Sequence, residues 1–187
     1  MIDEVGFTLY SELLNRAVRS LQAGRLPGTD TSLHSGTEIN LHAPALFPES
    51  YLPDVHLRLI LYKRLSSVKA LGALQELKEE IIDRFGVPPE SGQLLFRATE
   101  LKILATPMGI AKIDAGPRGA RIEFIDKPDI DPGAILRLLQ ASPRTYRLDG
   151  PNRLRIHGEM PDVDSRIKAI RLFIEALAPQ AKAVRDR

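Results

Sequence analysis

An amphipathic stretch at residues 74–86 constrains the fold more than any other part of this chain. Wound as a helix, it turns a mostly apolar side inward. That side carries Leu74, Leu77, Lys78, Ile81, Ile82 and Phe85. Gly86 suits a left-handed cap, and the prolines at 88 and 89 stop the helix. The pattern therefore predicts a helix that ends near Phe85 and has one buried side.

The opposite side of this predicted helix is acidic, with Glu76, Glu79, Glu80 and Asp83. Glu76/Glu80 and Glu79/Asp83 are like-charge pairs four residues apart, and each costs a few tenths of a kcal/mol. Only Glu80/Arg84 is a favourable pair at this spacing. The acids also lie toward the helix C-terminus, where the helix dipole disfavours them. A basic partner against this side would relieve the repulsion, although charge runs of this kind are usually ordinary solvated surface.

Size and composition place the chain among ordinary folded domains. It has 187 residues, is 43% hydrophobic and carries a net charge of +2, with the basic excess concentrated in residues 137–187. It has no cysteine, which excludes disulfides, iron–sulfur clusters and thiolate zinc sites. No apolar run is long enough to span a membrane, and the start does not resemble a signal peptide. We therefore expect a cytoplasmic protein with no membrane contact.

The first 36 residues differ in character from the rest. Residues 7–23 have a wide apolar band at helical spacing, which needs a partner surface. Residues 24–36 are rich in Gly, Pro, Thr and Ser and have no periodicity, which is typical of a flexible linker. We expect residues 1–23 to be the helical tail of a preceding domain, and residues 37–187 to form the main domain.

The main domain is predicted to be α+β, with helices first and then a small antiparallel sheet of hairpins covered by helices. Helices are expected at 54–66, 74–85, 90–106, 131–140 and 162–178. Strands are expected at 38–46, 110–115, 121–125, 146–148 and 154–156. In the first helix, Val55, Leu59 and Tyr62 should face inward, with Leu65 as a further candidate. Asp54, Asp131 and Asp162 or Asp164 are expected N-caps.

Motifs for catalysis or metal binding are missing from the sequence. There is no G-x-x-x-x-G-K-[ST] phosphate loop, no G-x-G-x-x-G and no G-x-S-x-G elbow. The four histidines lack metal-ligand spacing. Asp126, Asp129 and Asp131 could hold a divalent cation, but loop and cap roles explain them better. We therefore expect no catalytic residue, no metal site and no cofactor in this chain.

Arginines gather around the second predicted hairpin. Arg144, Arg147, Arg153 and Arg155 surround it, and Tyr146 interleaves with them, as on some nucleic-acid-binding surfaces. Strand alternation also places arginines on a solvent face as a matter of course. These arginines are therefore either ordinary solvent-exposed residues or residues that contact a nucleic-acid phosphate backbone weakly.

Five short segments carry a resemblance when they are taken in order. They are residues 51–59 (YLPDVHLRL), 61–65 (LYKRL), 80–86 (EIIDRFG), 109–114 (GIAKID) and 121–124 (RIEF). The series resembles the C-terminal domain of the bacterial transcription-repair coupling factor family, from about residue 37 to about residue 178. In that alignment residues 1–23 resemble the end of the second motor lobe.

The resemblance implies a regulatory role without catalysis. Members of the family are ATP-driven DNA translocases that push stalled RNA polymerase off damaged DNA and recruit excision repair through an N-terminal module. ATP, Mg²⁺ and DNA serve the motor, which this chain lacks. The C-terminal domain docks on the N-terminal module and masks its surface for the repair protein UvrA. By motif, the family's docking residues fall on Glu80, Asp83 and Arg84.

Because the sequence has no phosphate-cradling loop, the isolated chain should not hydrolyse ATP. A phosphate-release assay on the purified chain checks this expectation. Turnover that co-purifies with the chain and is lost on a point mutation would contradict it and indicate a small enzyme instead.

Overall fold

The computed structural model describes residues 36–178. They divide into two compact units, one of residues 43–100 and one of residues 36–42 with 101–178. The predicted tail helix at 7–23 and almost all of the predicted linker at 24–36 lie outside the described residues. No helix in the described part is long and apolar enough to cross a membrane.

The first unit is built from helices α2 (Val55–Ser67) and α3 (Leu71–Phe85) and most of α4 (Glu90–Ala105). The predicted N-cap of α2 is confirmed, since the Asp54 carboxylate accepts hydrogen bonds from the backbone N–H groups of His56 and Leu57. Gly86 ends α3 with φ +85°, a region that favours glycine. The first and second predicted helices are therefore in place.

Apolar stripes from these helices form the core of the first unit. On α3, Leu74, Leu77 and Ile81 are all buried, as predicted. Phe47 lies at the centre of an aromatic cluster, with ring centroids 5.5 Å from Tyr62 and 5.8 Å from Phe96. Aromatic pairs of this kind stabilise the folded state by more than the burial of their apolar surface alone does.

The predicted inward side of α2 is correct only in part. Leu65 is buried as predicted and Leu59 and Tyr62 are half-buried, but Val55 is 55% exposed and the other buried residues are Arg58 and Leu61. Arg58 can be buried because its guanidinium donates a hydrogen bond of 2.7 Å to the Leu52 carbonyl. The apolar periodicity of the sequence predicts that an arginine at this position is exposed. The carbonyl acceptor allows Arg58 to be buried instead.

The second unit is a five-stranded sheet with the order β1-β2-β3-β5-β4. Its strands are β1 (Glu38–Asn40), β2 (Ile110–Gly116), β3 (Gly119–Phe124), β4 (Tyr146–Leu148) and β5 (Arg153–His157). The helices are α5 (Pro132–Ala141) and α6 (Val163–Leu177), and a 3₁₀ turn, η1 (Thr106–Met108), follows α4. The α+β class is confirmed. The sheet is mixed rather than wholly antiparallel, because β1 pairs with β2 in parallel.

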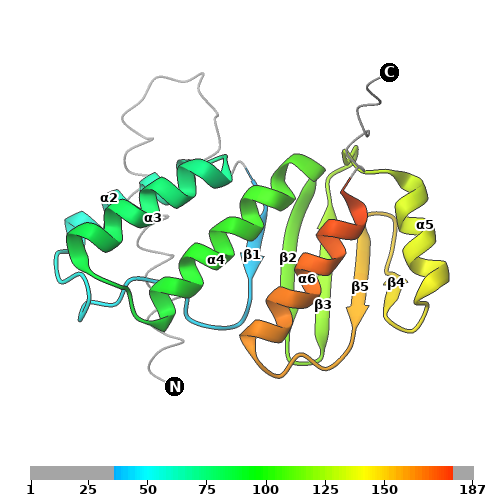
Figure 1. The fold of residues 1–187 in the computed structure, drawn as a ribbon. Coiled ribbons are helices and arrows are strands. Elements are labelled where there is room, and N and C mark those ends of the chain that lie inside the picture. The colour runs from blue at the N-terminus through cyan, green and yellow to red at the C-terminus, as the bar shows by residue number, and fades with distance from the viewer. Residues whose placement is uncertain (1–35, 179–187) are drawn as a thin grey trace, which may run out of the picture. The chain divides into compact units, whose positions relative to one another are not determined.

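Strand alternation gives the sheet two different faces. One is apolar, with Ile113, Ile122 and Leu154 fully buried at paired positions of β2, β3 and β5. Helix α6 lies across the sheet (Figure 1) and contributes Ile170, Phe173 and other buried residues to this core. The residues between them, on the other face, are polar.

The β2–β3 turn depends on a glycine. Gly119 has φ +147°, and a Cβ there would lie 2.4 Å from the Ile156 carbonyl oxygen of the neighbouring strand. Because backbone stands in the way, the tight approach of β5 to this turn requires a residue without a side chain.

Arg166 of α6 holds three chain segments of the second unit together from inside. It is 6% exposed and donates hydrogen bonds to the carbonyls of Met160 (2.9 Å), Leu41 (3.0 Å) and Pro161 (3.1 Å). The three carbonyls are acceptors that no apolar side chain can satisfy. This buried charge therefore fixes the segment after β1 and the loop that leads into α6.

Replacing Arg166 with Met should strand these buried carbonyls, and we expect the free energy of unfolding to fall by about 2–4 kcal/mol. Urea denaturation followed by circular dichroism measures the change. Lys168→Met, on the exposed side of the same helix, should change stability by less than about 0.5 kcal/mol. Equal effects of the two substitutions would contradict the role assigned to Arg166.

Candidate interaction surface on helix α3

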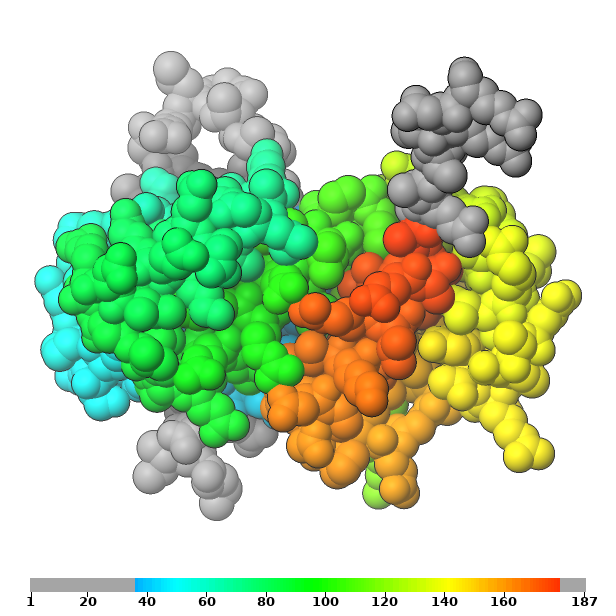
Figure 2. Space-filling model, in the orientation of Figure 1, coloured from blue at the N-terminus to red at the C-terminus, as the bar shows by residue number. Residues whose placement is uncertain are grey.

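The outer side of α3 carries the charged residues that the sequence assigns to docking. Asp83 and Arg84 are exposed, and Glu80 is half-exposed. Asp83 lies on the side of the helix opposite to the buried stripe, Glu80 lies on its flank, and Arg84 lies beside the stripe in the exposed last turn. In the space-filling view, the helices of the first unit, in cyan to green, form a broad surface toward the viewer (Figure 2).

Glu80 is held by an arginine from the neighbouring helix. Arg64 of α2 forms an ion pair and hydrogen bond with the Glu80 carboxylate. The hydrogen bond from Arg64 lowers the pKa of Glu80, and the positive charges of Arg64 and, to a lesser extent, Arg84 lower it further. The repulsion within the acidic side is thus partly relieved from within the chain, and mainly by Arg64 rather than by the predicted partner Arg84.

Arg84 and Asp83 are less engaged than Glu80. The Cζ atom of Arg84 lies 4.9 Å from the Phe85 ring centroid, a cation–π contact that leaves the guanidinium exposed. Within residues 36–178, the Asp83 carboxylate has no hydrogen-bond or ion-pair partner. An acid and a base with free hydrogen-bonding capacity therefore stand side by side on this surface.

No metal-binding cluster accompanies these charges in the part of the chain that the structure describes. Asp131 accepts a hydrogen bond from the Gly133 N–H at the start of α5, and it pairs with Arg137 at 3.0 Å. Asp126 accepts a hydrogen bond from Asn152. Capping and loop contacts thus occupy two of the three aspartates considered as cation ligands.

The arginines of the second hairpin are distributed differently from the prediction. Arg147 and Arg155 lie directly opposite each other on β4 and β5, whereas Arg144 precedes β4 in a turn. Tyr146 points to the other face, where its ring centroid lies 6.0 Å from that of Phe173. The predicted interleaving of Tyr146 with the arginines is therefore wrong. Arg121, opposite Arg155 on β3, was missed because sequence alone does not show that β3 pairs with β5.

These features define an α+β domain with charged surfaces on helix α3 and on the open face of its sheet. Residues 41–135 match the model of the TRCF domain family, about half of the chain. The chain therefore belongs to the TRCF domain family, and the resemblance to transcription-repair coupling factors is confirmed.

The curated relatives that the chain resembles are much longer than the chain itself. It is 39% identical over 182 residues to the transcription-repair-coupling factor of Escherichia coli K12, covering 97% of this chain and 16% of that protein. It is 38% identical over 149 residues to the Bacillus subtilis factor, covering 80% of this chain and 11% of that protein. The chain thus spans less than a fifth of the length of these relatives.

A solved structure shares the fold. The crystal structure of the C-terminal domain of a transcription-repair coupling factor superimposes with a TM-score of 0.63. The match covers 78% of this chain and 94% of that domain, at 19% sequence identity. The chain thus has the fold of a C-terminal domain of its family.

The Arg64–Glu80 pair can be tested by titration. In Arg64→Met the pKa of Glu80 should rise toward its ordinary value, and it should rise more than in Arg84→Met, because Arg64 supplies the hydrogen bond. The folded state lowers the pKa of Glu80. The stabilisation of the fold by the Arg64–Glu80 pair is therefore present above the unfolded-state pKa of Glu80, and it is lost as pH falls through the folded-state pKa. Carboxyl NMR titration of the three proteins measures this. A larger rise in Arg84→Met would mean that Arg84 is the main partner.

Proposed function

We propose that this chain is a non-catalytic, autoinhibitory interaction domain. It docks through Glu80, Asp83 and Arg84 on the N-terminal repair-protein-binding module of its own longer protein. In the docked state it masks the surface of that module to which UvrA binds. The observation that carries the proposal is the exposure of Asp83 and Arg84 and the half-exposure of Glu80 on α3, beside a stripe of Leu74, Leu77 and Ile81 that is buried in the core.

The electrostatics of this surface suit a partner with both signs of charge. The Asp83 carboxylate is a hydrogen-bond acceptor without a partner in the described residues. The next residue, Arg84, has an exposed planar guanidinium that can donate hydrogen bonds. A basic group opposite Asp83 and an acidic group opposite Arg84 would form charge-assisted hydrogen bonds. Such complementarity selects a partner and fixes its orientation more than it adds raw affinity.

Arg64 prepares Glu80 for this contact. The ion pair restricts a side chain that would otherwise be free, so less rotamer entropy is lost when a partner orders it. It also keeps Glu80 charged at lower pH, because its pKa is lowered. Arg64 is therefore a positioning residue, because it holds Glu80 in place on the docking surface. The exposed part of the Arg64 side chain can also contact the partner.

The longer protein is proposed to be an ATP-dependent DNA translocase that acts on stalled RNA polymerase in the cytoplasm. Its motor would hold ATP and Mg²⁺ and would contact DNA. The relatives bear the name transcription-repair-coupling factor, which supports a role in coupling transcription to repair. In this proposal the present domain adds regulation: it limits UvrA recruitment until the motor engages polymerase.

Charge reversal tests the docking surface. We expect Glu80→Lys/Asp83→Lys to weaken binding of this chain to the N-terminal module by about 2 kcal/mol or more, because partly desolvated charges lose their partners. In the full-length protein, the same change should strengthen UvrA binding in the absence of polymerase. Isothermal titration calorimetry measures both affinities.

The control makes the same change in charge elsewhere on the chain. Glu159 and Glu175 are exposed residues of the second unit, so Glu159→Lys/Glu175→Lys alters net charge equally without touching α3. Both double variants should melt near the temperature of the parent chain. Unchanged affinity for the module in a folded Glu80→Lys/Asp83→Lys protein would reject this surface as the docking site.

A further inference from the structure

The open face of the sheet in the second unit carries a row of arginines across three neighbouring strands. Arg121 of β3 lies opposite Arg155 of β5, and Arg155 lies opposite Arg147 of β4. Arg153 follows on the same face of β5, two residues from Arg155. All four side chains are exposed. They lie on the face of the sheet opposite to α6, because the alternate residues of β3 and β5 are buried.

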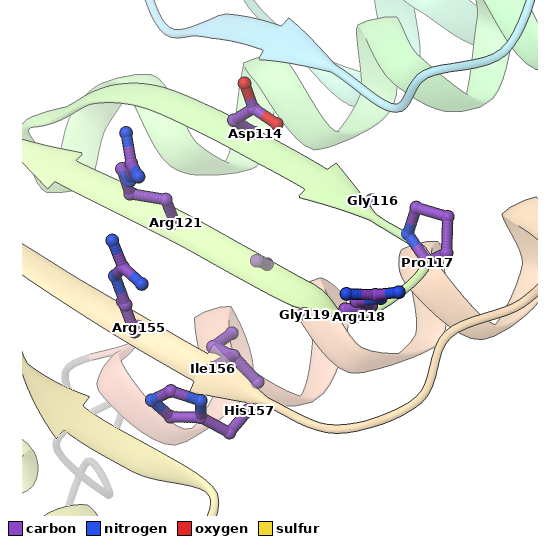
Figure 3. Close-up of a pocket in the computed structure, with 10 residues that line it drawn as sticks. Asp114, Gly116, Pro117, Arg118, Gly119, Arg121, Arg155, Ile156 and His157 are labelled. Carbon is purple, nitrogen blue, oxygen red and sulfur yellow. The ribbon is translucent and has the colours of Figure 1, made fainter.

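The close-up shows how two of these arginines stand. Arg121 and Arg155 project from neighbouring strands toward the same side of the sheet (Figure 3). They line a shallow hollow of about 430 Å³, which Arg118, His157 and one acid, Asp114, also border. Three arginine side chains from two hairpins thus line one open depression.

Acids of the domain offset only part of this positive charge. Arg155 pairs with Asp149 at 2.8 Å, which lowers the pKa of that carboxyl, and the charges of Arg153 and Arg121 lower it further. Asp114 lies opposite Arg121 and Glu123 lies opposite Arg153, although Arg118, Arg121 and Arg153 have no hydrogen-bonded partner within the described residues. Arg155 still lies directly opposite both Arg121 and Arg147, an unfavourable arrangement of like charges that an anion over the row would relieve.

We propose that this face, formed by β3, β5 and β4, binds the phosphate backbone of double-stranded DNA. Arginine forks match phosphate oxygens in a bidentate geometry. Strands lie about 4.8 Å apart, so the row from Arg121 to Arg147 spans roughly 10 Å. That length suits contact with neighbouring phosphates along one strand of a duplex.

The composition of the face favours a polyanion over a protein. Hot spots of protein interfaces combine arginine with Trp and Tyr anchors that fill desolvated pockets. The outward positions of β3 and β5 are Arg121, Glu123, Arg153, Arg155 and His157, with no large apolar side chain among them. Interfaces with nucleic acid are more polar and more positively charged.

The same face favours a duplex over a single strand. Single-strand binding surfaces stack bases on aromatic rings. The aromatic rings of the sheet, Phe124 and Tyr146, are instead turned to α6, where both contact Phe173. Because no aromatic ring of the sheet faces this side, we expect the arginines to contact the sugar–phosphate backbone of a duplex and not to read its bases.

The contact is limited to one half of the sheet. Toward β1 and β2 the open face carries Glu38, Lys112 and Asp114, and Asp114, which lies opposite Arg121, pairs with His42 at 2.6 Å. The two acids would repel a phosphate. The footprint is therefore about three or four phosphates on the β3–β5–β4 side, so binding should be weak and strongly dependent on salt.

The test measures binding of the 187-residue chain to a fluorescein-labelled 20-base-pair DNA duplex by anisotropy, from 20 to 200 mM NaCl. We expect log Kd to rise with log salt with a slope of about 3, from roughly 0.9 per phosphate contact. In Arg121→Gln/Arg147→Gln/Arg153→Gln, affinity at 20 mM salt should fall more than tenfold and the slope should approach zero. Lys63→Gln/Lys69→Gln/Lys168→Gln removes the same charge from exposed sites in α2, the α2–α3 turn and α6. It should bind nearly as the parent does.

Three results would overturn the proposal. One is no duplex binding at 20 mM salt. Another is equal loss in the arginine and lysine variants, which would mean a general charge effect. The last is tighter binding to a polyglutamate peptide than to the duplex, with loss in the arginine variant, which would assign the face to an acidic protein segment. Thermal melting of both variants shows that any loss is not due to unfolding.

Discussion

Burial of Leu74, Leu77 and Ile81 is the constraint on which the account of this domain depends. Three apolar side chains at helical spacing leave α3 one rotation about its axis, since any other would expose the stripe. With that rotation, Asp83 faces solvent and Glu80 lies within reach of Arg64, while Arg84, three residues after Ile81, is exposed beside the stripe in the last turn of α3. The charged surface is thus a consequence of core packing, and it needs no strain in the backbone.

Charges of one sign cluster on two surfaces of the chain, acidic residues on α3 and arginines on the sheet, and they are neutralised to different degrees. On α3, Arg64 reaches across from α2 and neutralises part of the acidic side. On the sheet, Asp149 pairs with Arg155, while Arg121 and Arg153 form no hydrogen-bonded ion pair in the described residues and are offset only by nearby acids. Exposed ion pairs contribute little to folding stability. Both surfaces therefore have charge to spare for partners, of opposite sign in the two cases.

Local pattern was enough to predict most elements and much of the α3 surface. The caps at Asp54, Asp131 and Asp162, the two hairpins and the buried stripe of α3 all depend on residues close in sequence, and the structure has them. Whether Glu80, Asp83 and Arg84 dock on a partner remains a prediction, because the described residues include only one side of that contact.

What the sequence could not show depends on contacts between distant segments. Arg58 and Arg166 are buried because backbone carbonyls are placed to accept their hydrogen bonds, and periodicity treats both as surface. The parallel pairing of β1 with β2 joins residues more than 70 positions apart. Pairing of β3 with β5 brings Arg121 to Arg155, and alternation turns Tyr146 away from both.

The central claim is that the outer side of α3 docks on the N-terminal module of the longer protein. Amide NMR of the ¹⁵N-labelled 187-residue chain, titrated with that module, tests it most directly. The account predicts shift changes and slowed exchange concentrated at residues 76–86 and near Arg64, with the amides of β5 unchanged. Binding that perturbs β5 and leaves α3 unchanged, or no binding at all, would contradict it.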